Sequence, residues 1–133
     1  MMKRTVAILI VLVSLLTSSV ALGASYSPGD LIKFIPTRLT VTNNSIKVEG
    51  YFVNMNSGMK VRNFYQYKMK LYHNGTLLAS GDFGTLSKFT VPAMGVRSHS
   101  FIFNGRNSLK NGTIICDDNY YCVITKCRFT TVR

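Results

Sequence analysis

The chain has 133 residues, enough for one domain with a real hydrophobic core. It carries 16 basic and 5 acidic residues, a net charge of +11, so its electrostatics favours anionic partners. Five acidic residues and two histidines leave few groups for acid–base catalysis or metal binding, so the composition disfavours an enzyme.

Residues 1–23 have the pattern of a secretory signal peptide. Lys3 and Arg4 precede an apolar run over residues 6–16, and the segment ends in the small residues Ala-Leu-Gly. We predict cleavage after Gly23, with cleavage after Ala24 as the alternative. The alternative is an uncleaved membrane anchor, but the apolar run is about half the ~20 residues that a spanning helix needs, so we expect cleavage and no transmembrane span after it. The mature chain is therefore expected to be secreted and extracytoplasmic.

Short runs with strand patterns follow. Residues 31–34 and 38–42 are predicted strands that flank Pro36. Residues 45–53, SIKVEGYFV, alternate between two faces with the period of a half-buried strand. Residues 54–58, NMNSG, have the composition of a turn.

The longest predicted strand spans Lys60–His73. Its odd positions are mostly apolar and its even positions mostly basic. We therefore expect the odd face to pack on the core and the even face to meet solvent. The even face consists of Lys60, Arg62, Phe64, Gln66, Lys68, Lys70 and Tyr72.

A hairpin is predicted where Asn74-Gly75 follows this strand, because both residues tolerate the positive φ of a type I′ turn. The return strand, residues 76–80, would set Leu71 opposite Leu78. Gly81 and Gly84 are expected to bracket a loop. The Asp-Phe-Gly tripeptide within that loop also occurs in protein kinases. The other kinase elements are missing, so we interpret it as a coincidence.

The rest of the chain is predicted to contain only strands and turns. Pro92 ends one strand, and the segment between Cys116 and Cys122 has the composition of a turn in a final hairpin. These features predict an all-β fold, an immunoglobulin-like antiparallel β-sandwich of about seven to nine strands. Residues 24–133 would form this single domain, with residues 104–133 as a cysteine-containing tail. The predicted strands are residues 88–91, 97–103, 113–116, 120–125 and 129–132.

Three cysteines lie in the last 18 residues, at positions 116, 122 and 127. An oxidising compartment permits a disulfide, and a bridge between Cys116 and Cys122 would close a short turn. Cys127 would then be left over, either buried or bonded to another chain.

Several motifs follow one another between residues 31 and 103. An aromatic-x-Pro start precedes a strand that ends in aromatic-x-Asn, and the segment closes with F-x-F. This order resembles the SLAP domain, a small β-sandwich module of bacterial S-layer-associated and cell-surface proteins. Residues 64–72 are also similar to FxLYD-type extracytoplasmic domains, whereas residues 104–133 depart from both patterns. The resemblance implies a non-enzymatic, envelope-associated module without an active site. The motif residues are Phe34, Pro36, Phe52, Asn54, Phe101 and Phe103.

We therefore expect a secreted, non-enzymatic binding or structural module at the cell surface. Its expected partner is an anionic cell-wall or envelope polymer, or another surface protein. Neither a specific nucleic acid nor a cofactor is expected. Cations along one strand face are able to follow a polyanion, and aromatic rings add contact area. An ordinary solvated strand face is the alternative interpretation. The candidate binding residues are Lys60, Arg62, Phe64, Lys68, Lys70 and Tyr72.

Two other functions stay open. A small secreted enzyme or toxin-like effector would need a nucleophile with a base, or paired carboxylates, and Asp117 and Asp118 are only neighbours in a turn. An extracytoplasmic copper carrier would use methionine and histidine. Two of the methionines flank a turn and are expected to be exposed. The residues available for copper are Met55, Met59, Met69, Met94, His73 and His99.

Overall fold

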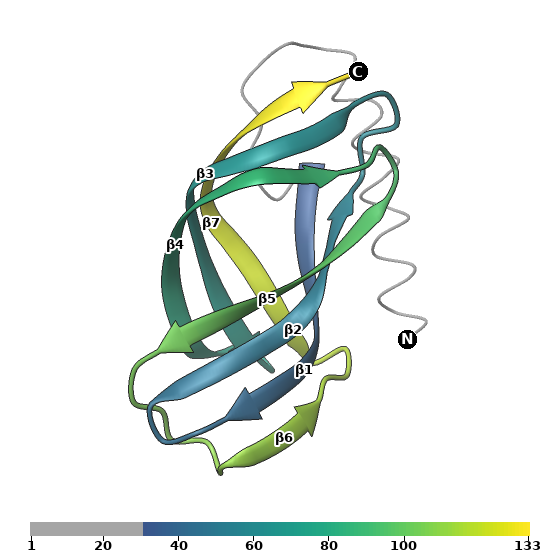
Figure 1. The fold of residues 1–133 in the computed structure, drawn as a ribbon. Helices are drawn as coiled ribbons and strands as arrows, with labels where there is room; N and C mark the ends of the chain where they lie inside the picture. The colour runs from purple at the N-terminus through teal and green to yellow at the C-terminus, as the bar shows by residue number, and fades with distance from the viewer. Residues whose placement is uncertain (1–30) are drawn as a thin grey trace.

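The computed structural model describes residues 31–133 (Figure 1). The predicted signal peptide and its cleavage site lie outside this range. The described chain forms seven strands in two antiparallel sheets, so the predicted all-β sandwich is confirmed. No helix among these residues is long and apolar enough to cross a membrane.

The two sheets differ in size. One has the strand order β5-β2-β1-β6 and the other has the order β4-β3-β7. In Figure 1 the smaller strand β6 lies at the bottom edge, and β7 runs behind the front sheet toward the C-terminus. The strands are β1 Ile32–Val41, β2 Ser45–Asn54, β3 Lys60–His73, β4 Thr76–Val91, β5 Val96–Asn104, β6 Gly112–Ile115 and β7 Tyr120–Val132.

The core between the sheets is rich in aromatic rings. Phe52 on β2 lies at its centre, with its ring centroid 5.0 Å from those of Phe34 and Phe64. Stacked and edge-to-face contacts of this kind each add about 0.5–1.5 kcal/mol beyond the burial of apolar area. The other rings near Phe52 are Tyr67, Phe89, His99 and Phe101.

The loop between β2 and β3 is organised by a buried asparagine. Asn54 donates from Nδ2 to the Met59 and Val91 carbonyl oxygens, at 2.9 and 3.2 Å, and its Oδ1 accepts from the Asn56 N–H at 3.0 Å. The turn predicted here is confirmed. Met55, expected to be exposed, is fully buried instead.

Two bulges in β3 change which side chains face the core. Asn63 has φ of 61° and Gln66 has φ of 53°, and the register with both neighbouring strands shifts at these positions. Relative to β7, each bulge adds one residue to β3, so the alternation of side chains is reversed for the residues between the two bulges. Phe64 is therefore fully buried and Tyr65 is 40% exposed, which is the reverse of the predicted faces. Beyond Gln66 the predicted alternation returns.

The hairpin after β3 is partly as predicted. Asn74 and Gly75 both have positive φ, and His73 pairs with Thr76 across a two-residue turn. Leu71, however, pairs with Ala79 and not with Leu78, because the register shifts by one residue next to the turn.

The loop predicted after residue 80 is wrong, since β4 continues through Gly81 and Gly84 to Val91. A side chain on Gly81 would collide with the Phe83 ring, which packs 4.5 Å from the Phe101 ring. Gly84 has φ of 63°, and its N–H donates to Asp82 Oδ1 at 3.1 Å. Gly81 therefore leaves room for the Phe83 ring, and Gly84 supplies the positive φ of a bulge. Neither glycine lies in a loop.

Two other boundaries differ from the predictions. The segments on either side of Pro36 form one strand, β1, with a bulge after Pro36. The predicted final hairpin is also wrong. Strand β6 pairs with β1 in one sheet and β7 pairs with β3 in the other, so residues 116–119 cross between sheets. Residues 120–125 and 129–132 are parts of the single strand β7.

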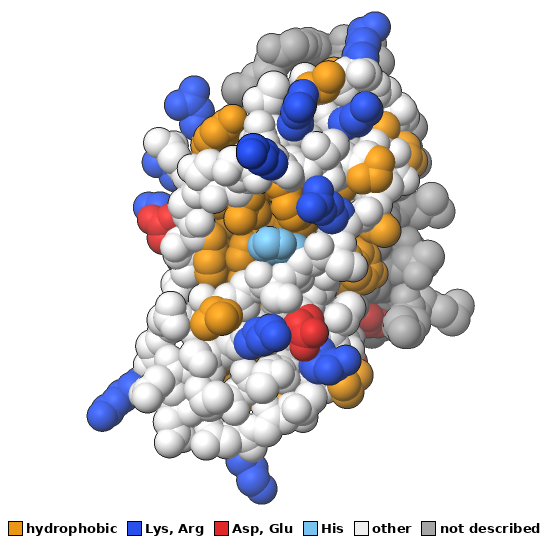
Figure 2. Space-filling view, viewed as in Figure 1, with side chains coloured by type: hydrophobic (Ala, Val, Ile, Leu, Met, Phe, Trp, Pro, Cys, Tyr) orange, Lys and Arg blue, Asp and Glu red, His pale blue; other side chains and the backbone are white. Residues whose placement is uncertain are grey.

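A half-buried histidine on β5 packs among aromatic rings of the core. Figure 2 shows hydrophobic side chains around a histidine on the face that carries β5. His99 packs there against Phe89 and Phe101, with centroids 5.1 and 4.7 Å away. The Arg97 guanidinium lies 4.1 Å above the Phe89 ring. Burial, and secondly the charge of Arg97, lower the pKa of His99 below its ordinary value.

Candidate polyanion-binding face

The outer face of the three-stranded sheet gathers most of the predicted site residues. Side chains of β3 that alternate with the buried Val61, Met69 and Leu71 point away from the core. Neighbouring strands add side chains to the same face through their register. We call this surface the basic face; its cations are Lys60, Arg62, Lys68, Lys70, Lys126 and Arg128.

Strand β7 contributes two cations that the sequence analysis missed. Arg128 is the register partner of Tyr65, and Lys126 is the register partner of Lys68. Both β7 side chains are exposed. Their i, i+2 spacing was visible in the sequence. Their position beside β3 depends on a pairing between strands about 60 residues apart, which no local pattern indicates.

The charge on this sheet is strongly one-sided. Strands β3, β4 and β7 contain seven basic residues and a single acidic one, Asp82. Asp82 Oδ2 lies 3.9 Å from Lys68 Nζ, and both side chains are about half exposed, so solvent weakens this ion pair. Lys68 also faces Lys126 across the ladder, and like charges in that position destabilise a sheet. The face therefore keeps positive charge that its own carboxylate does not balance.

Shallow depressions follow β3 along the basic face. The first is lined by Lys60, Arg62, Thr90 and Val132, with a volume of about 200 Å³. Another, of about 250 Å³, lies over Lys68 and Lys70 and extends to Ser80 and Asp82 on β4. Each of these hollows has at least two cations in its wall, so a negatively charged group could enter either of them without desolvating a deep pocket.

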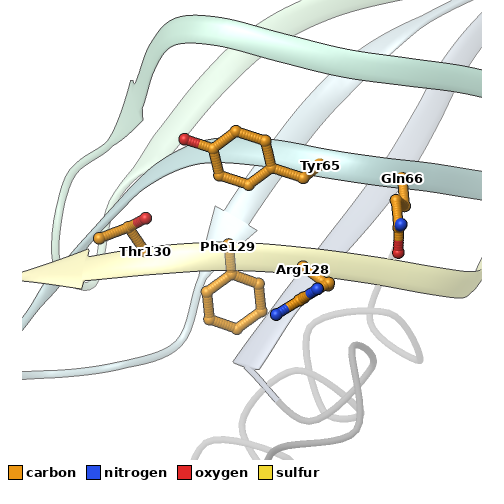
Figure 3. A pocket seen from close by; sticks show the side chains of 5 residues that line it. All are labelled: Tyr65, Gln66, Arg128, Phe129 and Thr130. Atoms are coloured by element: carbon orange, nitrogen blue, oxygen red, sulfur yellow. The ribbon is translucent and has the colours of Figure 1, made fainter.

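A third depression, of about 350 Å³, lies at the second bulge of β3 (Figure 3). Tyr65 and Gln66 come from β3, whereas Arg128, Phe129 and Thr130 come from β7. The Gln66 side chain extends from its strand toward β7. Strand β3 therefore contributes an amide and a phenol to this hollow, whereas β7 contributes the Arg128 cation.

The predicted site residues have different outcomes. Lys60, Arg62 and Lys68 are exposed, and Lys70 and Tyr72 are partly exposed, all on the basic face. Phe64, predicted as an apolar anchor on this surface, lies in the core and is not available to a partner. The bulge at Asn63 causes this change, and Tyr65 occupies the outer position instead.

An apolar row crosses the sheet at the end of the basic face. Tyr72 is the register partner of Leu77 on β4 and of Tyr121 on β7. The Tyr72 and Tyr121 rings stack with centroids 5.2 Å apart and planes inclined by 11°. Val123, the register partner of Lys70, is 41% exposed. Tyr72 was predicted as a site residue from the sequence, whereas Leu77 and Tyr121 were not.

The structure places none of the three cysteines at disulfide distance from another, so the bridge between Cys116 and Cys122 stays a prediction. Burial, and then the neighbouring Cys116, raise the pKa of Cys122. Burial also raises the pKa of Cys127 to about 12. The Cys127 Sγ lies 3.6 Å from the Arg128 carbonyl oxygen. A disulfide from Cys127 to another chain would first require exposure of this half-buried thiol.

Of the residues considered for copper, Met55, Met59 and Met94 lie in two loops that hydrogen-bond to each other, whereas Met69, His73 and His99 lie on strands β3 and β5. Met55 and Met69 are fully buried, and Met69 Sδ accepts a hydrogen bond of 3.1 Å from the buried Tyr67 hydroxyl. His73 stacks on Tyr120 near the β3–β4 turn, with ring centroids 4.1 Å apart. Within residues 31–133 no group of three or more His, Cys, Asp or Glu side chains is arranged to hold a metal ion.

Comparison with protein-family models, curated proteins and solved structures finds no match to this chain. Function is therefore inferred from the geometry and charge of the chain itself.

Proposed function

We propose that this protein is a secreted, non-enzymatic module of the cell envelope that binds an anionic surface polymer through the basic face. The observation that carries this proposal is the ratio of seven basic residues to one acidic residue in strands β3, β4 and β7. The envelope-associated role is also the one that the resemblance to SLAP-type domains implies.

The shape of the basic face suits a linear polymer. Lys60, Arg62, Lys68 and Lys70 follow one strand, and residues two apart on a strand are separated by about 6.6 Å. Such a row would place cations beside successive charges of an extended chain over several repeats. The binding would be weak per contact and would fall as salt screens exposed charges, because the Debye length is only about 8 Å at physiological ionic strength.

The opposition of Lys68 and Lys126 supports the same function. Two like charges on neighbouring strands reduce the stability of the free protein. An anion between them would remove that repulsion, so ligand binding and stability should be linked. For solubility alone, two lysines that face each other have no advantage over a face on which basic and acidic residues alternate.

Co-sedimentation of the purified protein with isolated envelopes of the source cell, at low and at high salt, tests this proposal. A charge-reversal variant carries Glu at Lys60, Arg62, Lys68 and Lys70. The matched control carries Glu at Lys33, Lys47, Arg106 and Lys110, which changes the net charge equally but leaves the basic face intact. Binding that is lost at high salt and in the first variant alone supports the proposal. Equal loss in both variants would reduce the effect to net charge, and no binding at low salt would refute an envelope role.

A further inference from the structure

The apolar row at the end of the basic face is unusual for a surface that binds only charge. Leu77, Tyr121 and Val123 are each 40–48% exposed, and the register brings all three beside Tyr72 or Lys70. Of the large hydrophobic side chains that the described part of the chain exposes, these three and Tyr65 lie on the outer face of the three-stranded sheet. A pure polyanion such as a phosphate polymer has no apolar surface that would pack on these side chains.

The Tyr121 ring is the accessible end of this row. One side of it stacks on Tyr72, with the centroids 5.2 Å apart. Within residues 31–133, strand β7 is the edge of its sheet, and the Tyr121 side chain remains 40% exposed. The row therefore offers one aromatic face and two aliphatic side chains next to the Lys70 ammonium.

This combination matches a sugar ring that carries an acid group. A pyranose has apolar C–H faces that pack on an aromatic ring. Lys70 and Lys68 would neutralise the carboxylates of this and neighbouring units. We propose that the anionic polymer is an acidic polysaccharide, and that Tyr121 and Tyr72 hold one of its sugar rings. This inference rests on the proposed function of the basic face.

Single-stranded nucleic acid fits the same face less well. Proteins that bind it stack successive bases on successive exposed rings. Here Tyr72 and Tyr121 already stack on each other. Only one ring face is left beside several cations, so successive bases would find no successive rings to stack on. A lipid surface is also less favoured. The apolar row lies across the face of the sheet and not on a projecting loop that could insert into a bilayer.

The test compares affinities for two polyanions of matched charge, polygalacturonate and inorganic polyphosphate. Three variants are measured with the wild type: Tyr121→Ala, Tyr121→Phe, and Ile102→Ala, whose exposed aliphatic side chain lies on the other sheet. We expect the wild type to prefer polygalacturonate. Tyr121→Ala should lower the ratio of the two affinities about tenfold, whereas Tyr121→Phe and Ile102→Ala should each change it less than about twofold.

Each failure has its own signature. If both polymers bind and Tyr121→Ala leaves their ratio unchanged, the sugar-stacking inference is wrong and the basic face remains. If neither polymer binds the wild type at low salt, the proposed function itself fails. Tighter binding to a thymidine oligonucleotide, or to vesicles of phosphatidylglycerol and phosphatidylcholine, would replace the polysaccharide by that class of ligand.

Discussion

Asn63 Oδ1 accepts a hydrogen bond of 3.3 Å from the backbone N–H of Phe89. This bond joins β3 to β4 at the first bulge of β3, where the ordinary ladder is interrupted. Asn63 has φ of 61°, a conformation that asparagine tolerates better than most residues. At this bulge the alternation of β3 changes phase, so that Phe64 is buried and Tyr65 is exposed.

Replacement of Asn63 should destabilise the fold in a graded way. Asn63→Gly keeps the positive φ accessible but removes the hydrogen bond, whereas Asn63→Val also forces a β-branched residue into a strained conformation. We expect the free energy of unfolding to fall by about 1 kcal/mol for glycine and by about 2–4 kcal/mol for valine. Urea denaturation measures both. A valine variant as stable as the glycine variant would show that the bulge does not require a left-handed residue.

The altered phase of β3 predicts opposite results for two adjacent aromatic residues. Phe64→Ala should lower the free energy of unfolding by about 3–5 kcal/mol, because Phe64 is fully buried beside Phe52. Tyr65→Ala should cost no more than about 1 kcal/mol, because that side chain is 40% exposed. Thermal and urea unfolding of the two variants provide the comparison. Similar losses for both would mean that the bulge is absent in solution.

Stability should depend on pH through His99. Its pKa in the folded protein lies below the ordinary value of 6.5, chiefly because it is buried among phenylalanine rings. As the pH falls below about 6.5, the unfolded chain binds a proton that the folded protein still excludes. As the pH falls from about 6.5 to the folded pKa, the free energy of unfolding therefore decreases. Above about pH 6.5 the histidine is neutral in both states and no longer destabilises the folded protein.

His99→Phe keeps an aromatic ring in the cluster and removes the titrating group. Urea unfolding between pH 5 and pH 8 should give a flatter profile for this variant than for the wild type. Parallel profiles over this range would contradict the account of His99.

The buried thiols should react slowly in the folded protein. Burial raises the pKa of Cys122 and of Cys127, so very little thiolate is available at pH 8. In a Cys116→Ser variant, we expect these two thiols to react with Ellman's reagent at least ~100-fold more slowly in buffer than in guanidinium chloride. Reaction of either thiol within the mixing time in buffer would place it at the surface. Absence of any thiol after unfolding would instead reveal a disulfide.

Sequence patterns predicted the parts of this fold that depend on local chemistry. The alternation in residues 45–53 and the Asn74-Gly75 turn both correspond to the structure, since side-chain period and positive φ are local properties. The bulge at Asn63 depends on a bond to Phe89, 26 residues away, which no alternation could indicate. Gly81 and Gly84 have the composition of a loop, yet pairing with β3 keeps them in a strand.

The candidate site was predictable to a similar extent. The alternation of residue types predicted the exposed cations of β3. These cations lie before the first bulge or after the second, where the predicted alternation holds. Lys126, Arg128 and Tyr121 were missed because they join the site only through the pairing of β7 with β3. The final hairpin was predicted from the short distance along the chain between β6 and β7. In the structure these two strands belong to different sheets, because β6 pairs with β1 and β7 pairs with β3.

The most direct test of the basic face is a titration of the isotope-labelled protein with polygalacturonate, followed by NMR amide shifts at low salt. We predict that the largest shifts lie on β3 between Lys60 and Tyr72 and on β7 near Lys126 and Arg128. All of them should decrease together as salt is added. Shifts that instead concentrate on β5, or on Arg106 and Lys110 in the loop before β6, would contradict the account and place the binding surface elsewhere.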